Sequence, residues 1–272
     1  MSTITKAIIP VAGWGTRMLP ITKAIEKCML PIGTRPVIDY VVRDLIDAGI
    51  NDIYFVVGEQ STQVQNYYRS NIQLNDYLKR QGKEEKLPLV APIEGVNFHF
   101  IVQPSSGKYG TAVPVGLVNE YISDNELVAV IMGDDFIYNQ DGTNEIKRLI
   151  DGAEESGSMI GVNVGRDDVS RYGVLQLDER GNYQKIVEKP KAEDAPSTLI
   201  NVSKYVLPKV AIEAAVTIPV NPTRGEYEIT DVINQYVEQG GSIKVVEAKG
   251  EFLDAGSVEG WLHANNVVVG NA

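Results

Sequence analysis

Short apolar runs alternate with segments of helical periodicity along most of the chain. Residues 6–11 (KAIIPV) are apolar after the first lysine, which predicts a buried strand at the start of the fold. In residues 36–48, apolar side chains occupy positions 37, 38, 41, 42, 45 and 46. This spacing predicts an amphipathic helix that ends at Gly49. Residues 52–57 predict the next strand, and residues 61–68 predict another helix.

The same alternation continues through the middle of the chain. Residues 97–102, 127–132 and 159–164 are further apolar runs that predict buried strands. Strands that alternate with helices are typical of an α/β fold with a doubly wound, mostly parallel (mixed) sheet flanked by helices. In such sheets, ligands bind at the carboxyl ends of the strands.

Two stretches interrupt this rhythm. Residues 66–96 are polar, charged and proline-containing, which predicts an insertion over the active face or, equally, a packing arm for a partner subunit. Residues 171–190 predict a β-hairpin that turns at Gly181. The tail, residues 261–272, predicts a short helix. No linker divides the chain, so we expect residues 1–272 to form a single domain.

The composition is that of an acidic globular protein. The formal net charge is −11 at pH 7, with 43% hydrophobic and 22% charged residues among 272. A protein that binds duplex nucleic acid normally carries a basic face, so nucleic acid is excluded as a partner. No stretch approaches the ~18 unbroken apolar residues of a membrane span, which excludes a membrane protein.

Cysteine usage and the N-terminus favour the cytoplasm. Cys28 is the only cysteine, so neither an internal disulfide nor a cysteine metal site can form. The chain starts with MSTITK and enters the first strand without the features of a secretory signal. We therefore expect a cytoplasmic protein.

A glycine-rich turn follows the first predicted strand. Residues 12–20 read AGWGTRMLP, and Lys27 follows ten residues after Arg17. Glycines here let the backbone approach a phosphate chain, and successive N–H groups can bind an anion. Arg17 can clamp phosphate oxygens, and Lys27 adds a mobile charge. Met18 replaces the third glycine of the dinucleotide fingerprint, and no G-K-[ST] of a P-loop follows.

Two aspartates come directly after apolar runs, Asp134 in VIMGDDF and Asp254 in FLDAGS. Either one alone would be typical of a turn or a helix cap. Placed at strand ends, however, two carboxylates together with substrate phosphates form the ligand set that Mg²⁺ prefers. Asp135 is ambiguous, and we expect a solvent-facing structural role for it.

The glycine-rich turn resembles that of the sugar-phosphate nucleotidylyltransferases. Their signature is an N-terminal strand, then G-x-G-T-R-[ML]-x-P, then a lysine before an apolar-proline step, which here is KCMLP at residues 27–31. The resemblance runs from Lys6 to about Trp261 and implies a nucleotide-diphospho-sugar transferase fold of the Rossmann-like type. It also implies that Ala12, Gly13, Gly15 and Thr16 bind the nucleotide and that Arg17 and Lys27 are catalytic.

Within this family, the segment PVAGWGTRMLPITKAIEKCMLPI is most similar to the corresponding segment of the bacterial UTP–glucose-1-phosphate uridylyltransferases. Two residues depart from their usual pattern: Glu26 replaces a proline, and Cys28 replaces an acidic residue. Both flank Lys27 without removing it.

The resemblance assigns the remaining ligands as well. It implies that Asp134 and Asp254 hold Mg²⁺, that Gln103 and Gly110 bind a uracil or thymine base, and that Lys189 faces the sugar-bound phosphate. In the Y-G-V and E-K-P motifs, Gly173 and Glu188 would hold the hexose. Asn201 stands where the family usually has a glycine in the strand before K/R-Y-V-L, and we expect it to tolerate left-handed geometry and contact the sugar.

These features predict an enzyme that forms UDP-glucose and pyrophosphate from UTP and glucose 1-phosphate. The alternatives are a thymidylyl- or cytidylyltransferase acting on a hexose 1-phosphate, or a nucleotide-sugar sensor without turnover. The long segment 66–96 favours the uridylyl branch. Members of the family commonly form dimers or tetramers, so we expect a homodimer or homotetramer.

Overall fold

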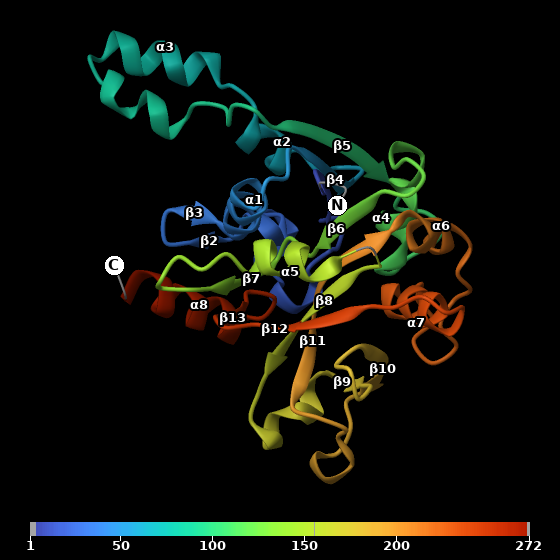
Figure 1. Ribbon diagram of the computed structural model, residues 1–272. Helices are drawn as coiled ribbons and strands as arrows, with labels where there is room; N and C mark the ends of the chain where they lie inside the picture. Colours follow the sequence, from blue (N-terminus) through green and yellow to red (C-terminus); the bar gives the residue numbers. More distant parts are fainter. Residues whose placement is uncertain (1–3, 155, 271–272) are drawn as a thin grey trace.

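The computed structural model describes residues 4–154 and 156–270, and a nine-stranded mixed sheet forms its centre (Figure 1). The strands follow the order β10-β9-β11-β6-β1-β4-β5, with β8 paired to β11 and β12 paired to β8. Their bounds are β1 Lys6–Pro10, β4 Asp52–Gly58, β5 Asn97–Gln103, β6 Leu127–Ile131, β8 Ser158–Asn163, β9 Gly173–Leu177, β10 Tyr183–Glu188, β11 Leu199–Pro208 and β12 Lys244–Glu247.

The sheet is parallel in its N-terminal half and antiparallel around β11. Strands β6, β1, β4 and β5 run parallel to one another, whereas β11 is antiparallel to β6, β8 and β9. The α/β class with a mixed sheet is confirmed. The predicted hairpin at 171–190 is also present, as the antiparallel pair β9 and β10.

The central strands are apolar on both faces because helices cover both. In β1, Ala7 and Ile9 belong to the core on one face, and Ile8 belongs to the core on the other. All three are fully buried, and burying an isoleucine side chain contributes roughly 1.5–3 kcal/mol. This arrangement explains why a short continuous apolar run, rather than an alternating one, marks these strands.

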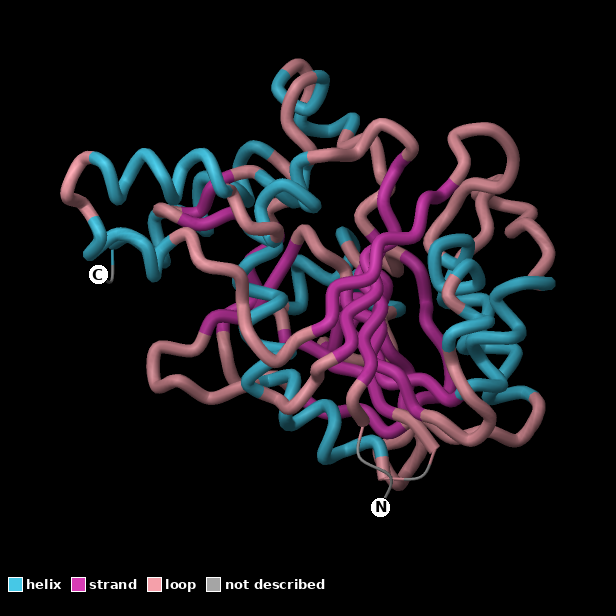
Figure 2. The backbone as a smooth tube through the Cα atoms, turned by 90° about the horizontal axis from the view of Figure 1, so that it is seen from above, coloured by secondary structure: helices cyan, strands magenta, loops and turns pink. Residues whose placement is uncertain are grey.

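Helices α1 and α5 cover one face, and α4, α6 and α7 pack together on the other (Figure 2). The predicted helix over 36–48 is α1, and it ends where Gly49 adopts a φ of 97°. The α-helices are α1 Val37–Asp47, α2 Gln63–Tyr68, α3 Ile72–Arg80, α4 Ala112–Leu117, α5 Glu145–Ala153, α6 Lys209–Thr217, α7 Ile229–Glu238 and α8 Val258–Gly270.

Two small two-stranded sheets lie beside the central one. One pairs β7 (Asp135–Tyr138) with β13 (Glu251–Asp254), and the other pairs β2 (Pro31–Ile32) with β3 (Arg35–Pro36). The C-terminal helix α8 packs on β13 and β2. It begins at Val258, three residues before the predicted start, and the last two residues of the predicted tail lie outside the described residues.

The segment 66–96 forms an arm that projects from the body of the protein (Figure 1). After the end of α2 it contains α3 and the 3₁₀ helix η4 (Glu84–Leu89), and it then leads into β5. None of its residues lines either of the two large cavities described below. An insertion over the active face and a packing arm for a partner subunit both stay predictions. No helix among the described residues is long and apolar enough to cross a membrane.

Candidate active site

Two adjoining cavities lie at the carboxyl ends of the parallel strands. Their volumes are ≈ 200 Å³ and ≈ 370 Å³. Parallel strands end at the same edge of a sheet, so the segments that follow β1, β4, β5 and β6 meet there. The residues that line both cavities are Val11, Ala12, Gly13, Lys27, Gln103 and Tyr109.

The glycine-rich turn forms one wall and contacts residues 22–27, which we call the lysine loop. Gly15 adopts a left-handed φ of 62°, and a Cβ there would lie 3.0 Å from the Thr22 side chain and 3.1 Å from Cβ of Lys27. Thr22 Oγ1 donates a hydrogen bond of 2.9 Å to the Gly15 carbonyl. Glycine is required here by both conformation and space. Ala12 and Gly13 line the cavities, whereas Gly15 and Thr16 line neither of them.

Four charged side chains meet next to the smaller cavity. A Cβ placed on Gly256 would lie 2.6 Å from Asp254 Oδ1, 2.7 Å from Lys27 Nζ and 2.9 Å from a terminal nitrogen of Arg17. Lys27 also forms an ion pair with Asp134. The structure thus brings together the two predicted catalytic cations and the two predicted metal-binding carboxylates.

Strand pairing explains why these two aspartates are neighbours. Strands β7 and β13 are antiparallel, with Asp254 opposite Asp135, and Asp134 directly precedes β7. Burial alone would raise the pKa of Asp134, but Lys27, Lys204 and Arg17 together hold it below the usual value. Asp134 therefore stays ionised at neutral pH.

The donor set at this point fits a Mg²⁺ ion. Within the described residues, no group of three or more His, Cys, Asp or Glu side chains could hold a metal by itself. Mg²⁺ is typically bound by only one or two carboxylates plus substrate phosphates. Asp134 and Asp254 supply these carboxylates next to the cavity that Asp134 lines. Lys27 and Arg17 lie beside these carboxylates and balance their charge.

Asp135 does not face solvent, contrary to our expectation. Its side chain is buried and ion-paired with Lys204, which is only 2% exposed and lies in β11. Burial raises the pKa of Asp135 to about 7, and Lys204 opposes this shift. A buried charge needs a partner, and Lys204 in β11 is the partner of Asp135 in β7. Lys204 was not singled out in the sequence, although a lysine inside an apolar strand run was a usable signal.

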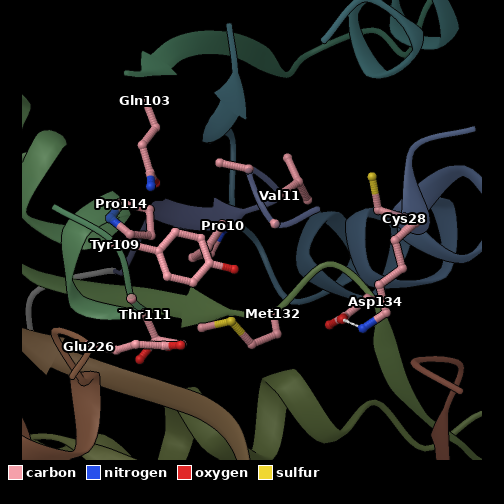
Figure 3. Close-up of a pocket in the computed structure, with 14 residues that line it drawn as sticks. Pro10, Val11, Cys28, Gln103, Tyr109, Thr111, Pro114, Met132, Asp134 and Glu226 are labelled. Carbon is pink, nitrogen blue, oxygen red and sulfur yellow. Dashed lines mark hydrogen bonds and ion pairs between the residues drawn. The ribbon is translucent and has the colours of Figure 1, made fainter. Parts of the chain in front are cut away.

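The smaller cavity contains groups suited to a base (Figure 3). Gln103, the last residue of β5, is 8% exposed, and its Oε1 has no hydrogen-bond partner among the described residues. Gly110 has a φ of 131°, and a Cβ there would overlap the backbone of Tyr227. The Tyr227 carbonyl accepts a 2.9 Å hydrogen bond from the Ala112 N–H at the start of α4. Gly110 is therefore fixed against Tyr227 by a close backbone contact.

The predicted sugar-binding residues lie outside the walls of both cavities. Gly173 faces Glu188 across the hairpin, and Glu188 forms an ion pair with Arg224. Arg224 also donates to Glu228 at 3.3 Å, and Glu228 accepts from Thr111 Oγ1 at 3.1 Å. This chain of polar contacts links the hairpin to the wall of the smaller cavity. Arg224 was missed in the sequence because it lies in a loop without a motif of its own.

Lys189 has an unusual backbone. Its φ is 44° although it precedes Pro190, a position that disfavours such geometry, and its N–H donates to the Tyr172 carbonyl at 3.0 Å. Strain of this kind persists where surrounding structure enforces it, and it gathers at functional sites.

The left-handed residue of β11 is Ser203, with a φ of 51°, and not Asn201 as expected. Asn201 instead accepts a hydrogen bond from the Ser203 N–H at 3.2 Å and donates one to the Tyr205 hydroxyl at 2.9 Å. Its amide stabilises the irregularity between Asn201 and Tyr205, where β11 shifts register against β8.

Comparisons with known proteins agree with this architecture. Residues 6–269 match the family model described as nucleotidyl transferase. The chain is 38% identical over 270 residues to a protein of Methanocaldococcus jannaschii provisionally named a UTP–glucose-1-phosphate uridylyltransferase, covering 96% of this chain and 92% of that protein. It is 34% identical over 273 residues to UTP–glucose-1-phosphate uridylyltransferase 2 of Streptococcus pyogenes serotype M3, covering 96% and 89%.

Solved structures extend the likeness to the whole fold. The UTP-bound UGPase of Acinetobacter baumannii superposes with a TM-score of 0.86 at 28% identity, covering 97% of this chain and 93% of that one. A UDP-glucose pyrophosphorylase in complex with UDP-glucose superposes with a TM-score of 0.82 at 28% identity, covering 99% and 100%.

Proposed function

The chain belongs to the nucleotidyl transferase family, and from this premise we propose that it makes UDP-glucose and pyrophosphate from UTP and glucose 1-phosphate. The observation that carries the proposal is the meeting of Arg17, Lys27, Asp134 and Asp254 beside a cavity at the sheet edge. The choice of substrates is supported by the names of the relatives and of the similar solved structures.

The reaction needs positioning and charge neutralisation more than proton transfer. An oxygen of glucose 1-phosphate, already ionised, forms a bond to the α-phosphorus of UTP. The bond from that phosphorus to the oxygen bridging to the β-phosphate breaks, and pyrophosphate leaves with the bonding electrons. No side chain has to act as a covalent nucleophile, so catalysis rests on geometry and electrostatics.

The charged groups divide this work. The backbone of Ala12 and Gly13 approaches the nucleotide, and Arg17 and Lys27 stabilise negative charge on the triphosphate as the bond to the leaving group breaks. Asp134 and Asp254 would hold Mg²⁺, which when bound supplies charge neutralisation between the phosphates of the two substrates.

Different residues hold the base and the sugar. The unpaired Oε1 of Gln103 can accept the imide N–H of uracil while its amide group donates to a carbonyl oxygen. Glu188 accepts hydrogen bonds from glucose hydroxyls, Lys189 faces the sugar phosphate, and Gly173 leaves room beside Glu188. Asn201 contributes by shaping β11 next to the hairpin.

A panel of nucleoside triphosphates against sugar 1-phosphates, read out by pyrophosphate release, tests the proposal. We expect UTP with glucose 1-phosphate to give the highest kcat/KM. Arg17→Ala and Asp134→Ala should each lower kcat by about 100-fold or more, because the first removes a cation that stabilises the transferring phosphates and the second removes a carboxylate that would hold Mg²⁺. Lys6→Ala, which breaks an ion pair with Glu126 elsewhere, is the control and should stay near wild type. Near-normal turnover in either site variant would sink the assignment.

We propose further that the protein is a homo-oligomer, a dimer or tetramer, that uses the arm as a contact. Ile72 is 71% exposed and Leu89 is 82% exposed, and both lie on the arm. Apolar side chains grouped at the surface mark interaction sites, and these two residues lie far from the cavities.

A further inference from the structure

Glu26 immediately precedes Lys27, and its carboxylate is held by backbone and side chain of a different segment. Its Oε1 accepts hydrogen bonds from the Thr62 N–H at 3.0 Å and the Gln63 N–H at 2.8 Å. Its Oε2 accepts one from Ser61 Oγ at 2.6 Å. These donors lie at the start of α2, where backbone N–H groups have no partner within the helix.

The contact is reciprocal. The Glu26 N–H donates to Gln63 Oε1 at 3.0 Å, and Gln63 Nε2 donates to the Ala24 carbonyl at 2.8 Å. Five hydrogen bonds therefore join residues 24–26 to residues 61–63. We call this set the Glu26 clamp.

The clamp supplies the cap that α2 lacks. Thr62, the N-cap residue of α2, makes no side-chain capping bond. The Glu26 carboxylate takes over this role from 36 residues away in the chain, and its negative charge is favoured at the helix N-terminus. No cation forms an ion pair with Glu26 among the described residues, so the N–H and hydroxyl groups satisfy its charge.

Helix α2 is a fixed support for the clamp. Val64 is fully buried and Tyr68 is 6% exposed, and both anchor the helix in the core beside β4. The Ser61 N–H also donates to the Gly58 carbonyl at the end of β4. The clamp therefore fixes the lysine loop to the same sheet edge on which the cavities lie.

We infer that Glu26 is a positioning residue for Lys27. The Glu26 carbonyl accepts the Met29 N–H at 2.8 Å, so Glu26 also sets the start of the short helix that carries Lys27. Because the backbone and the side chain of Glu26 are both held, the Lys27 backbone has a fixed place. The Lys27 ammonium group forms an ion pair with Asp134. The inference rests on the proposed function, in which Lys27 acts on the triphosphate.

The backbone at Glu26 offers a second way to fix the loop. Its φ is −59°, close to the value that a proline ring imposes. Glu26→Pro would lose the carboxylate and the N–H yet keep this dihedral angle locked. Glu26→Ala would lose the carboxylate and leave the dihedral angle free. Both variants lack the charge of the side chain, so a difference between them reports the rigidity of the loop.

The test compares kcat and KM for UTP in the full-length protein, with pyrophosphate release as the readout. We expect Glu26→Ala to lower kcat about tenfold with KM for UTP within twofold, because a catalytic group displaced by about 1 Å can cost up to 100-fold in rate. Glu26→Gln keeps an oxygen acceptor for the two N–H groups and should stay within threefold of wild type. Glu26→Pro should exceed Glu26→Ala in kcat.

Two comparisons make the result decisive. Asn71→Ala removes the side-chain cap of α3, a bond of 3.0 Å to the Leu74 N–H on the arm, and should cost similar stability without changing kcat. A double variant, Glu26→Ala with Gln63→Ala, should be no slower than Glu26→Ala alone, since both disrupt one unit.

A kcat for Glu26→Ala within twofold of wild type overturns the inference, as does an equal loss in Glu26→Pro. If Glu26→Ala does not fold, the comparison of Glu26→Pro and Gln63→Ala with wild type decides, and wild-type kcat in both overturns it. A wild-type chain that turns over another nucleotide but not UTP contradicts the proposed substrate instead. The same variants are then compared with the nucleotide that is used.

Discussion

Ser203 holds a backbone conformation that costs an L-residue free energy. Its φ of 51° lies in the left-handed region, which glycine adopts without a Cβ penalty of about 1–2 kcal/mol. We expect Ser203→Gly to be more stable than Ser203→Ala by about 1 kcal/mol. Both variants lose the hydroxyl, so Ser203→Ala is the matched control, and the difference between them reports the dihedral angle alone.

Urea denaturation measures this difference through the transition midpoints at equal slope. A glycine variant no more stable than the alanine variant would show that the Asn201 amide, which accepts the Ser203 N–H, already offsets the strain. The irregularity of β11 would then owe its stability to the side chain of Asn201.

The site residues that can be predicted from the sequence are those that lie close together in one motif. Gly15, Arg17 and Lys27 stand together in one motif, and the chain brings them together again in space. The Lys204–Asp135 ion pair could not be predicted in this way. It joins residues 69 apart, and its existence depends on β11 lying beside β6 in antiparallel orientation. Pairing across a sheet is set by topology, which residue patterns do not encode locally.

Substitutions that break the proposed subunit contacts of the arm should leave the catalytic activity of each chain unchanged. We expect the double variant Ile72→Ser with Leu89→Ser to keep kcat/KM per chain within twofold of wild type, because no arm residue lines either cavity. The same variant should have a lower molar mass in solution, because two exposed apolar contacts are lost from the proposed interface. Light scattering after size-exclusion chromatography measures the mass.

The control for the arm variant uses two exposed valines on another face. Val210, in α6, is 51% exposed, and Val220, which follows α6, is 44% exposed. Val210→Ser with Val220→Ser should leave the mass unchanged. An unchanged mass in the arm variant would place the contact on another face. A loss of activity per chain would show that the arm acts on the site through its partner.

Elements differ in how clearly the sequence predicts them. β1, β4 and β6 are buried on both faces, and a continuous apolar run identifies each. β7 and β13 have four residues each and form a sheet of their own. So short a strand gives no reliable period, and these two escaped prediction although their pairing places Asp254 opposite Asp135, the neighbour of Asp134 in sequence. The sequence thus indicated the proposed metal-binding residues without the small sheet that brings them together.

At the scale of the whole molecule, the candidate site is assembled from both ends of the chain. Gly13 follows the first strand, Gln103 ends β5, Asp134 follows β6, and Asp254 ends the last strand. A ligand that contacts all of them joins segments that are far apart in sequence, and it therefore stabilises the fold as a unit. A ligand at 100 times its Kd adds about 2.7 kcal/mol to the free energy of unfolding.

We expect this stabilisation to require Mg²⁺ and UTP together. Lys27 pairs with Asp134, and Arg17 and Lys27 lie beside Asp254, so the carboxylates offer a free cation little gain. UTP would draw the two cations onto its phosphates and release the carboxylates for the metal. Thermal unfolding should therefore show a Tm shift of several degrees with both ligands and less than about 1 °C with Mg²⁺ alone.

Asp254→Asn should abolish most of the joint Tm shift, whereas Asp47→Asn, on the exposed side of α1, should keep it. Adding a chelator should reverse the shift without unfolding the protein, because Lys27 can then pair with Asp134. A shift with Mg²⁺ alone as large as that with both ligands would mean that the carboxylates bind metal without the nucleotide. Lys27 would then not compete with the metal for Asp134, and the nucleotide would not be needed to release the carboxylates.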